Sequence, residues 1–324
     1  MFAKFLYIVL LIFKNLFLVL AKLTSNRKSK KHSSFLIRSL ISILSQVINK
    51  IGLIHLLSIS PDGKSYSVQD GILLNNQGTN RYLKWRTQNS NQAYWMDQQI
   101  IEHGIVPKTI LDVGANDGEV SLYFSKKYPK SKIFSVEPSP ANILILEDNL
   151  SIQNFTTSNI NLIKKAVSDE PGFVKMNTEL GSEDSIVSAS TADGSKQSTK
   201  STTVEATTLT NICKEFEIKE IDFLKIDIEG AEPLLNSCLD LLLPNIKSML
   251  VEFCHKNSFE SYEKLLKTIF SHNMICYNKY GGSIKNTKTL NEAIESIKPE
   301  LNKKNNINLD YFFVKQELIN KKKI

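Results

Sequence analysis

The sequence lacks the cysteine spacings that zinc sites and disulfide frameworks require. It has four cysteines, none of them in a Cys-x-x-Cys pair: Cys213, Cys238, Cys254 and Cys276. Each lies in an apolar or mixed segment, so we predict four reduced thiols packed in or near a core. Such thiols are typical of a reducing compartment, and we expect a cytoplasmic protein.

Runs of glycine and proline are also missing, with 13 Gly and 9 Pro among 324 residues. The chain is 42% hydrophobic and 23% charged, which is the composition of a folded globular protein. These values exclude a disordered chain, a collagen and a polytopic membrane protein. The length suits one large domain with an appendage.

Acidic residues are absent from the first 61 positions, which hold nine of the 40 Lys and Arg residues. The 40 basic residues less these nine leave 31, against 33 acidic ones, so the body carries a net charge of −2 although the whole chain carries +7. A nucleic-acid-binding body is expected to have a basic face of its own. The charge therefore argues against nucleic acid as a partner.

Two apolar stretches, Phe5 to Ala21 and Phe35 to Leu57, flank the basic linker NRKSKKH in this region. A membrane-spanning helix would have to bury the charge of Lys14, and a signal peptide would need a small-residue cleavage site that is missing near Ala21. We favour two amphipathic helices lying on an anionic membrane surface. The alternative is a helical hairpin that caps the folded domain.

Strands and helices alternate through the rest of the chain. The predicted strands are 109–113, 132–136, 160–167, 221–226, 249–253, 274–277 and 311–315, and the predicted helices are 91–104, 119–128, 138–150, 231–242 and 258–271. The alternation predicts an α/β fold with a doubly wound, mostly parallel, Rossmann-like sheet. We expect a helical appendage over 1–60, an N-terminal extension over 61–107, the sheet domain over 108–316 and a basic tail over 317–324.

One stretch breaks the alternation. Residues 182–203 include eleven Ser or Thr among 22 positions. We interpret the stretch as a loop or a mobile lid, or as a solvated insertion without function.

The strongest chemical signal is ILDVGANDGEVSLYF, residues 110–124. An apolar strand that ends near Asp112 passes through a glycine loop directly into a helix. Gly114 permits a tight turn and a close approach of the backbone to a ligand, and the helix beginning near Gly118 directs free N–H groups to the same place. The spacing Asp-x-Gly-x-x-x-Gly differs from the Gly-x-Gly-x-x-Gly loop that accommodates a pyrophosphate. It therefore favours S-adenosylmethionine over a nicotinamide dinucleotide.

A second signal is Glu137, which ends the next strand and lies 19 residues after Gly118. An acid at this position can accept hydrogen bonds from both ribose hydroxyls of a bound nucleoside. Alone it could merely favour a helix start before Pro138. In register with the glycine loop it predicts a cofactor site.

A third signal is the block IDFLKIDIEGAE, residues 221–232. A central parallel strand should be apolar on both faces, yet Lys225 and Asp227 lie at its carboxyl end, where ligands bind in open α/β sheets. The alternative is a buried structural ion pair. The block MLVEFCH adds Glu252 at the end of the neighbouring strand, with His255 three residues later.

Together these blocks resemble the FkbM family of S-adenosylmethionine-dependent methyltransferases. The matching pieces are TILDVGANDGEVSLYFS, IFSVEPSP, AVSDEPG at 166–172, TTLTNI at 207–212 and FLKIDIEGAEPLL. The resemblance covers roughly residues 92–255, and LKIDIEGAE is its most family-specific part. The family usually has Leu-Asp-Asp where this chain has Leu209, Thr210 and Asn211. If those acids bind substrate, the substrate contacts here differ.

The resemblance implies methyl transfer to an oxygen, often a hydroxyl of a sugar, a glycan, a glycolipid or another small molecule. It assigns the cofactor to a set of loop residues: Asp112, Gly114, Asn116, Asp117, Gly118, Glu137, Ser168 and Asp169. A hydroxyl nucleophile needs a base or a metal. We predict Asp227 as the base, with Glu229, Glu252 and His255 as alternatives. Two or three of these carboxylates could instead hold a divalent cation. No sequence feature fixes a metal site, so none is predicted.

Two other function classes stay open on the sequence. One is a nicotinamide-dependent oxidoreductase on a similar sheet. The other is a non-catalytic module that binds a membrane surface and uses the fold as a scaffold.

Overall fold

The computed structural model describes residues 57–59, 65–69, 72–75, 92–153, 155–177, 185–186, 201–255, 257–280, 283–301 and 309–320. It divides the chain into two compact units, residues 1–90 with 151–153, and residues 91–150 with 154–324. The predicted apolar helices lie outside the described residues, except for Leu57, which begins a strand. Among the residues that are described, no helix is both long and apolar enough to cross a membrane.

Apart from residues 151–153, the described part of the first unit is a small antiparallel sheet. Its strands are β1 (Leu57–Ile59), β2 (Ser65–Gln69) and β3 (Ile72–Asn75), in that order. Ile72 and Leu74 are buried, as the alternation of side chains along a strand allows.

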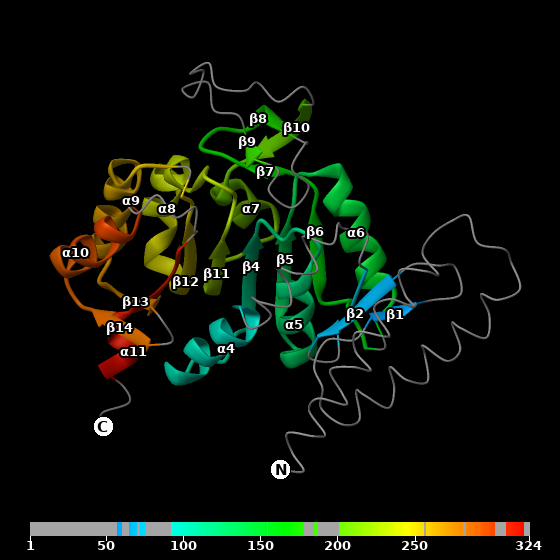
Figure 1. Ribbon diagram of the computed structural model, residues 1–324, viewed down its shortest axis with the longest axis horizontal. Helices are drawn as coiled ribbons and strands as arrows, with labels where there is room; N and C mark the ends of the chain where they lie inside the picture. Colours follow the sequence, from blue (N-terminus) through cyan, green and yellow to red (C-terminus); the bar gives the residue numbers. More distant parts are fainter. Residues whose placement is uncertain are drawn as a thin grey trace, which may run out of the picture. The chain divides into compact units, whose positions relative to one another are not determined.

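The second unit is built on an eight-stranded sheet (Figure 1) with the order β14-β13-β15-β12-β11-β4-β5-β6. The strands are β4 (Thr109–Val113), β5 (Lys132–Val136), β6 (Ile160–Ile163), β11 (Ile221–Ile226), β12 (Ile246–Phe253), β13 (Met274–Tyr280), β14 (Ser283–Thr287) and β15 (Leu309–Lys315). β4, β5, β6, β11 and β12 pair in parallel, and β15 lies antiparallel between β12 and β13. The prediction of a mostly parallel Rossmann-like sheet is therefore confirmed.

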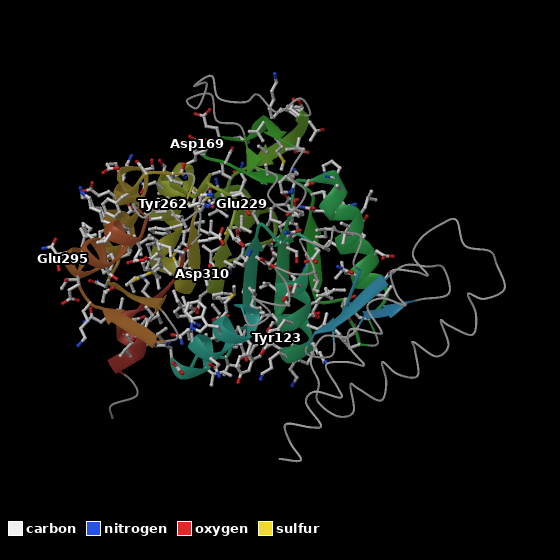
Figure 2. The ribbon with its side chains drawn as sticks, viewed as in Figure 1. Tyr123, Asp169, Glu229, Tyr262, Glu295 and Asp310 are labelled. Atoms are coloured by element: carbon white, nitrogen blue, oxygen red, sulfur yellow. The ribbon has the colours of Figure 1, made fainter. Side chains whose placement is uncertain are left out.

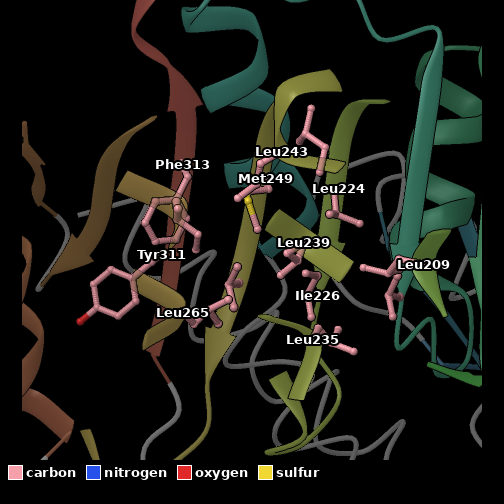
Figure 3. Packing of buried hydrophobic residues seen from close by; sticks show 14 of the residues in the cluster. Leu209, Leu224, Ile226, Leu235, Leu239, Leu243, Met249, Leu265, Tyr311 and Phe313 are labelled. Carbon is pink, nitrogen blue, oxygen red and sulfur yellow. The ribbon is translucent and has the colours of Figure 1, made fainter. Parts of the chain in front are cut away.

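Helices cover both faces of this sheet. They are α4 (Gln92–Glu102), α5 (Glu119–Lys127), α6 (Pro140–Ser151), α7 (Leu209–Glu215), η3 (Glu232–Leu235), α8 (Asn236–Leu242), η4 (Leu243–Asn245), α9 (Phe259–Ser271), α10 (Leu290–Leu301) and α11 (Gln316–Asn320). Alternate strand residues such as Leu224, Ile226 and Phe313 share one core (Figure 3) with Leu209 and Leu239 of the helices.

The opposite face of the sheet is covered by α4 and α5. The ring of Phe124 on α5 lies 5.4 Å from that of Phe223, and Trp95 on α4 meets Phe312 edge-on at 6.4 Å. Because strand side chains alternate between faces, Asp112 and Lys225 belong to this second face. The two layers of helices thus leave the ends of the parallel strands as the place for a site.

The prediction of a single strand over 160–167 is wrong. β6 ends at Ile163, and the chain leaves the central sheet before β7 (Ala166–Val167). The two intervening lysines pair with separate elements, since Lys164 reaches Glu147 and Lys165 reaches Glu205. β7 joins a second sheet, in the order β7-β10-β8-β9, with β8 (Gly172–Asn177), β9 (Ser185–Ile186) and β10 (Ser201–Thr207).

This second sheet takes up both ends of the Ser/Thr-rich stretch, which the sequence predicts as a loop. Residues 187–200 lie outside the described part of the chain. Another difference is that the helix predicted over 231–242 begins as the 3₁₀ turn η3, with Pro233 in its first positions.

The cysteines behave as predicted. All four are free and buried. Burial raises the pKa of Cys213 to about 11 and that of Cys276 to about 12, so these thiols stay protonated at neutral pH.

Candidate functional site

The predicted site residues gather where the strand order reverses. From β4, the chain builds the sheet outward through β5 and β6 on one side, and later through β11 and β12 on the other. In open α/β sheets, ligands bind outside the carboxyl ends of the strands at such a reversal. The loops after β4, β5, β11 and β12 carry most of the predicted residues.

The packing of the backbone around position 114 requires a glycine there. Its φ is +81°, and a Cβ atom there would collide with the backbone carbonyl oxygen of Asp227. The amide of Asp227 in turn donates to the carbonyl of Val113 at 3.1 Å. The close approach predicted for a ligand is thus one between two loops of the protein, and it locks the β4 loop onto the β11 loop.

The remainder of this loop turns its amides toward the end of β5. Asn116 adopts a left-handed backbone with φ +52°, and its N–H donates to a carboxyl oxygen of Glu137 at 2.8 Å. Gly118 is the N-cap of α5 with φ +84°. Asp117 is buried, and its carbonyl accepts a hydrogen bond from Asn149 at 2.7 Å.

Glu137 is almost fully buried, with 4% of its surface exposed. It accepts three hydrogen bonds, from the amide of Asn116, the amide of Ser139 at 2.9 Å and the side chain of Asn142 at 3.3 Å. Burial raises its pKa, and these bonds and the positive charge of Lys225 oppose the rise. A carboxylate has about four acceptor positions, so roughly one remains for a ligand hydroxyl.

A buried lysine connects the strands β4 and β11. The Nζ atom of Lys225 lies 3.1 Å from Asp227 Oδ2 and 3.5 Å from Asp112 Oδ1, and it donates to the carbonyl of Gly114 at 3.0 Å. Asp112 is fully buried and accepts a further bond from Ser121 at 2.7 Å. Burial lowers the pKa of Lys225, but the charges of Asp227 and Asp112 outweigh it and hold the pKa above its ordinary value.

Asp227 is the member of this trio that reaches solvent. Its side chain is 22% exposed, against 3% for Lys225 and 0% for Asp112. Carboxyl oxygens of Asp227, Glu229 and Glu252 all lie within 4.8 Å of one another and could hold a divalent cation. Burial, followed by the charges of Asp227 and Asp310, raises the pKa of Glu252 well above its ordinary value.

Three other predicted residues lie elsewhere in the loops. His255 lies two residues after the end of β12 and is partly buried. It does not belong to the cluster of Asp227, Glu229 and Glu252. Ser168 and Asp169 follow β7, which belongs to the second sheet. Ser168 is buried, with its amide bonded to Thr207 at 2.9 Å, while Asp169 is exposed.

The buried residues that support the site were not predicted from the sequence. Ser121 and Asn142 hold Asp112 and Glu137, and Glu232 binds the amides of the β11 loop. Each is a polar residue in an otherwise helical segment close to a predicted loop. That position is the only signal the sequence offers for them.

The comparisons with known proteins all find methyltransferases. The model of the methyltransferase FkbM domain matches residues 112–279. "Methyltransferase 1" of the fungus Beauveria bassiana is 27% identical over 176 residues, which is 49% of this chain and 70% of that protein. The 2-O-methyltransferase NoeI of Sinorhizobium fredii is 24% identical over 179 residues, 51% of this chain and 71% of that protein.

Among solved structures, methyltransferase FkbM of Methylobacillus flagellatus is similar with a TM-score of 0.40 and 13% identity. The alignment covers 64% of this chain and 43% of that chain.

Proposed function

Because the chain belongs to the methyltransferase FkbM domain family, we propose that this methyltransferase moves the methyl group of S-adenosylmethionine to a hydroxyl oxygen. We further propose that the hydroxyl belongs to a sugar, a glycan or a glycolipid. One observation carries the proposal: the partly exposed carboxylate of Asp227 lies on the same loop junction as Gly114, beside the loop that Glu137 anchors.

The residues present fit the ribose of an adenosine group and offer no free cation to a phosphate among the residues described at this site. Glu137 keeps about one acceptor position, which suits a ribose hydroxyl. Lys225 lies beneath the β4 loop but is already paired with two carboxylates, so it is not available to a phosphate. Of the cofactor residues predicted from the sequence, Asn116 and Glu137 lie at the centre of the proposed site, whereas Asp112 is fully buried, is paired with Lys225 and supports the β4 loop from beneath.

The proposed chemistry is an in-line displacement. When bound, S-adenosylmethionine supplies a methyl group on a sulfonium, which leaves as a neutral thioether. Asp227 accepts the proton of the acceptor hydroxyl as the new O–CH₃ bond forms. Lys225 forms an ion pair with Asp227 that fixes the position of its carboxylate, and the ends of the strands hold the reactants in line, which supplies much of the rate enhancement.

Support for a hydroxyl acceptor comes from one relative. NoeI is named a 2-O-methyltransferase, and its similarity extends across 71% of its length. We carry only the class of acceptor atom over to this chain. The clustered carboxylates around Asp227 suit that class, because they can accept hydrogen bonds from neighbouring hydroxyls.

The test is transfer of a radiolabelled methyl group from S-adenosylmethionine to a cell-envelope extract. We expect label in the carbohydrate or glycolipid fraction that survives mild alkali, because methyl ethers resist base whereas methyl esters hydrolyse. Label that alkali releases would overturn the hydroxyl acceptor, and label in RNA would overturn the acceptor class.

We also propose that residues 1–60 attach the enzyme to the cytoplasmic face of a membrane. This rests on the sequence, which places nine positive and no negative charges among apolar stretches. Each Lys or Arg near an anionic surface contributes about 1 kcal/mol. Flotation on liposomes that contain anionic lipid tests the proposal. The full chain should float at low salt and a chain lacking residues 1–60 should not, and a full chain that stays at the bottom of the gradient contradicts it.

A further inference from the structure

Glu232 is a buried carboxylate that the proposed reaction does not use. It begins η3, directly behind the loop that carries Asp227 and Glu229, and its exposed fraction is 0%. Its Oε1 atom accepts hydrogen bonds from the amide of Ile228 at 3.0 Å and the amide of Gly230 at 3.1 Å. These two amides lie on either side of Glu229.

Glu229 needs such support. Its φ is +56°, a conformation that side-chain-bearing residues seldom adopt and that the surroundings have to enforce. By holding the amide before Glu229 and the amide after it, one carboxyl oxygen fixes this turn. This backbone turn then determines the directions of the Glu229 and Asp227 side chains.

The second oxygen of Glu232 reaches another loop through Tyr262 on α9. The Tyr262 hydroxyl donates to Glu232 Oε2 at 2.9 Å and accepts from the amide of Cys254 at 2.8 Å. It also accepts from the side chain of Asn257 at 3.1 Å, and Asn257 donates to the carbonyl of Gly230 at 2.7 Å. Because both acceptor positions of the hydroxyl are filled, its single proton is directed to Glu232.

The network therefore ties the loop after β11 to the loop after β12. Cys254 immediately follows Phe253, the last residue of β12, and stands two residues after Glu252. Figure 2 shows Tyr262 and Glu229 toward the same end of the sheet, with Tyr123 toward the other end. The acids from the two strands thus share one buried support.

We propose that Glu232 is a positioning residue that, through Tyr262, sets the Asp227–Glu229 loop and the Glu252 strand end in the geometry that methyl transfer requires. The inference rests on the proposed function for its kinetic consequence. The positioning of the loop by Glu232 does not depend on the proposed function, because the hydrogen bonds involve only residues of this chain.

Two variants test the proposal, with a matched control. Glu232→Gln keeps one acceptor oxygen, so it cannot serve both the loop amides and Tyr262. Tyr262→Phe removes the link to Cys254 and leaves the Oε1 bonds in place. Tyr123→Phe is the control, because its hydroxyl also donates to a buried carboxylate, Asp97 at 3.0 Å, but between α4 and α5.

The first measurement is amide hydrogen exchange by NMR in the full chain, which needs no acceptor. Glu232→Gln should lower the protection of the Ile228 or Gly230 amide about tenfold or more. Tyr262→Phe should lower that of Cys254 and spare the other two. Unchanged protection in both variants would overturn the proposal.

The second measurement separates positioning from general loss of structure. Affinity for S-adenosylmethionine should stay within about threefold in both variants, because the contacts of Glu137 are untouched, while kcat for labelled methyl transfer falls about tenfold or more. A kcat equal to that of Tyr123→Phe would overturn the proposal. A loss of cofactor affinity as large as the loss of kcat would also overturn it. If the wild type transfers no methyl group, the proposed function has failed, and the exchange of the loop amides still decides whether Glu232 sets the loop.

Discussion

Glu137 is the residue on which the assignment of the cofactor depends most. Its carboxylate receives two backbone N–H groups, from Asn116 and Ser139, so it both fixes these loops and offers an acceptor to a ribose hydroxyl. Glu137→Gln should weaken S-adenosylmethionine binding about tenfold or more, because a bond to a charged acceptor contributes about 1.5–3 kcal/mol. Calorimetric titration measures this.

Glu147→Gln is the matched control, since Glu147 lies on the neighbouring helix α6 and is exposed, with an ion pair to Lys164. Equal cofactor affinity in the two variants would remove Glu137 from the site.

Asp227 is the proposed base. Asp227→Asn keeps the shape of the side chain but loses its basicity, so kcat should fall about tenfold or more, within the range that general base catalysis supplies. Its circular dichroism and its affinity for the cofactor should remain those of the wild type. Asp240→Asn, at an exposed acid bonded to His272, should leave kcat unchanged. A fully active Asp227→Asn enzyme would transfer the role to Glu229 or Glu252.

Glu252 links the site to the dependence of stability on pH. Burial and neighbouring carboxylates raise its pKa in the folded state. A raised carboxyl pKa means that the folded chain holds a proton the unfolded chain has lost, so stability falls as pH rises from the unfolded pKa through the folded one. At pH 8 Glu252→Gln should therefore have a free energy of unfolding about 1 kcal/mol or more above that of the wild type. Urea unfolding measures this difference.

The same comparison at pH 5 should show a smaller difference, because a raised pKa means that less of the wild-type carboxyl has lost its proton at the lower pH. A variant that is less stable than the wild type at pH 8 would show that the charge of Glu252 stabilises the fold.

At the scale of elements, the junction of β4 with β11 depends on Gly114. Gly114→Ala should destabilise the protein by about 1–3 kcal/mol from the backbone conformation alone, and by more because the added Cβ meets the carbonyl of Asp227. Gly172→Ala is a suitable control, since its φ is also positive but an added Cβ meets nothing within 4 Å. Denaturant unfolding compares them, and equal losses would mean that the collision is relieved at no cost.

Elements that depend on local patterns were predictable from the sequence. The apolar runs at 109–113 and 221–226 became β4 and β11 with the predicted bounds. The second sheet was not predictable, because β10 is polar along its exposed side and is defined by its pairing with β7 and β8, far away in the chain. For the same reason the buried support of the site was not predictable, since Glu232 and Tyr262 are 30 residues apart in the sequence.

At the scale of the whole molecule, the fold brings two chemistries to one edge. Loops on the β5 side of the reversal present amides and the Glu137 carboxylate, while loops on the β11 side present the acids near Asp227. Gly114 and Lys225 join the two sides by direct contact, so a ligand on one side should influence the geometry on the other. Methyl transfer needs this coupling, because donor and acceptor have to meet in line.

Equilibrium dialysis of the full chain against labelled S-adenosylmethionine and labelled NADH tests whether this edge of the sheet binds S-adenosylmethionine. We predict saturable binding of one S-adenosylmethionine per chain, which unlabelled S-adenosylhomocysteine displaces and NADH does not. Saturable binding of NADH with no binding of S-adenosylmethionine would contradict the cofactor site proposed for Glu137 and the β4 loop.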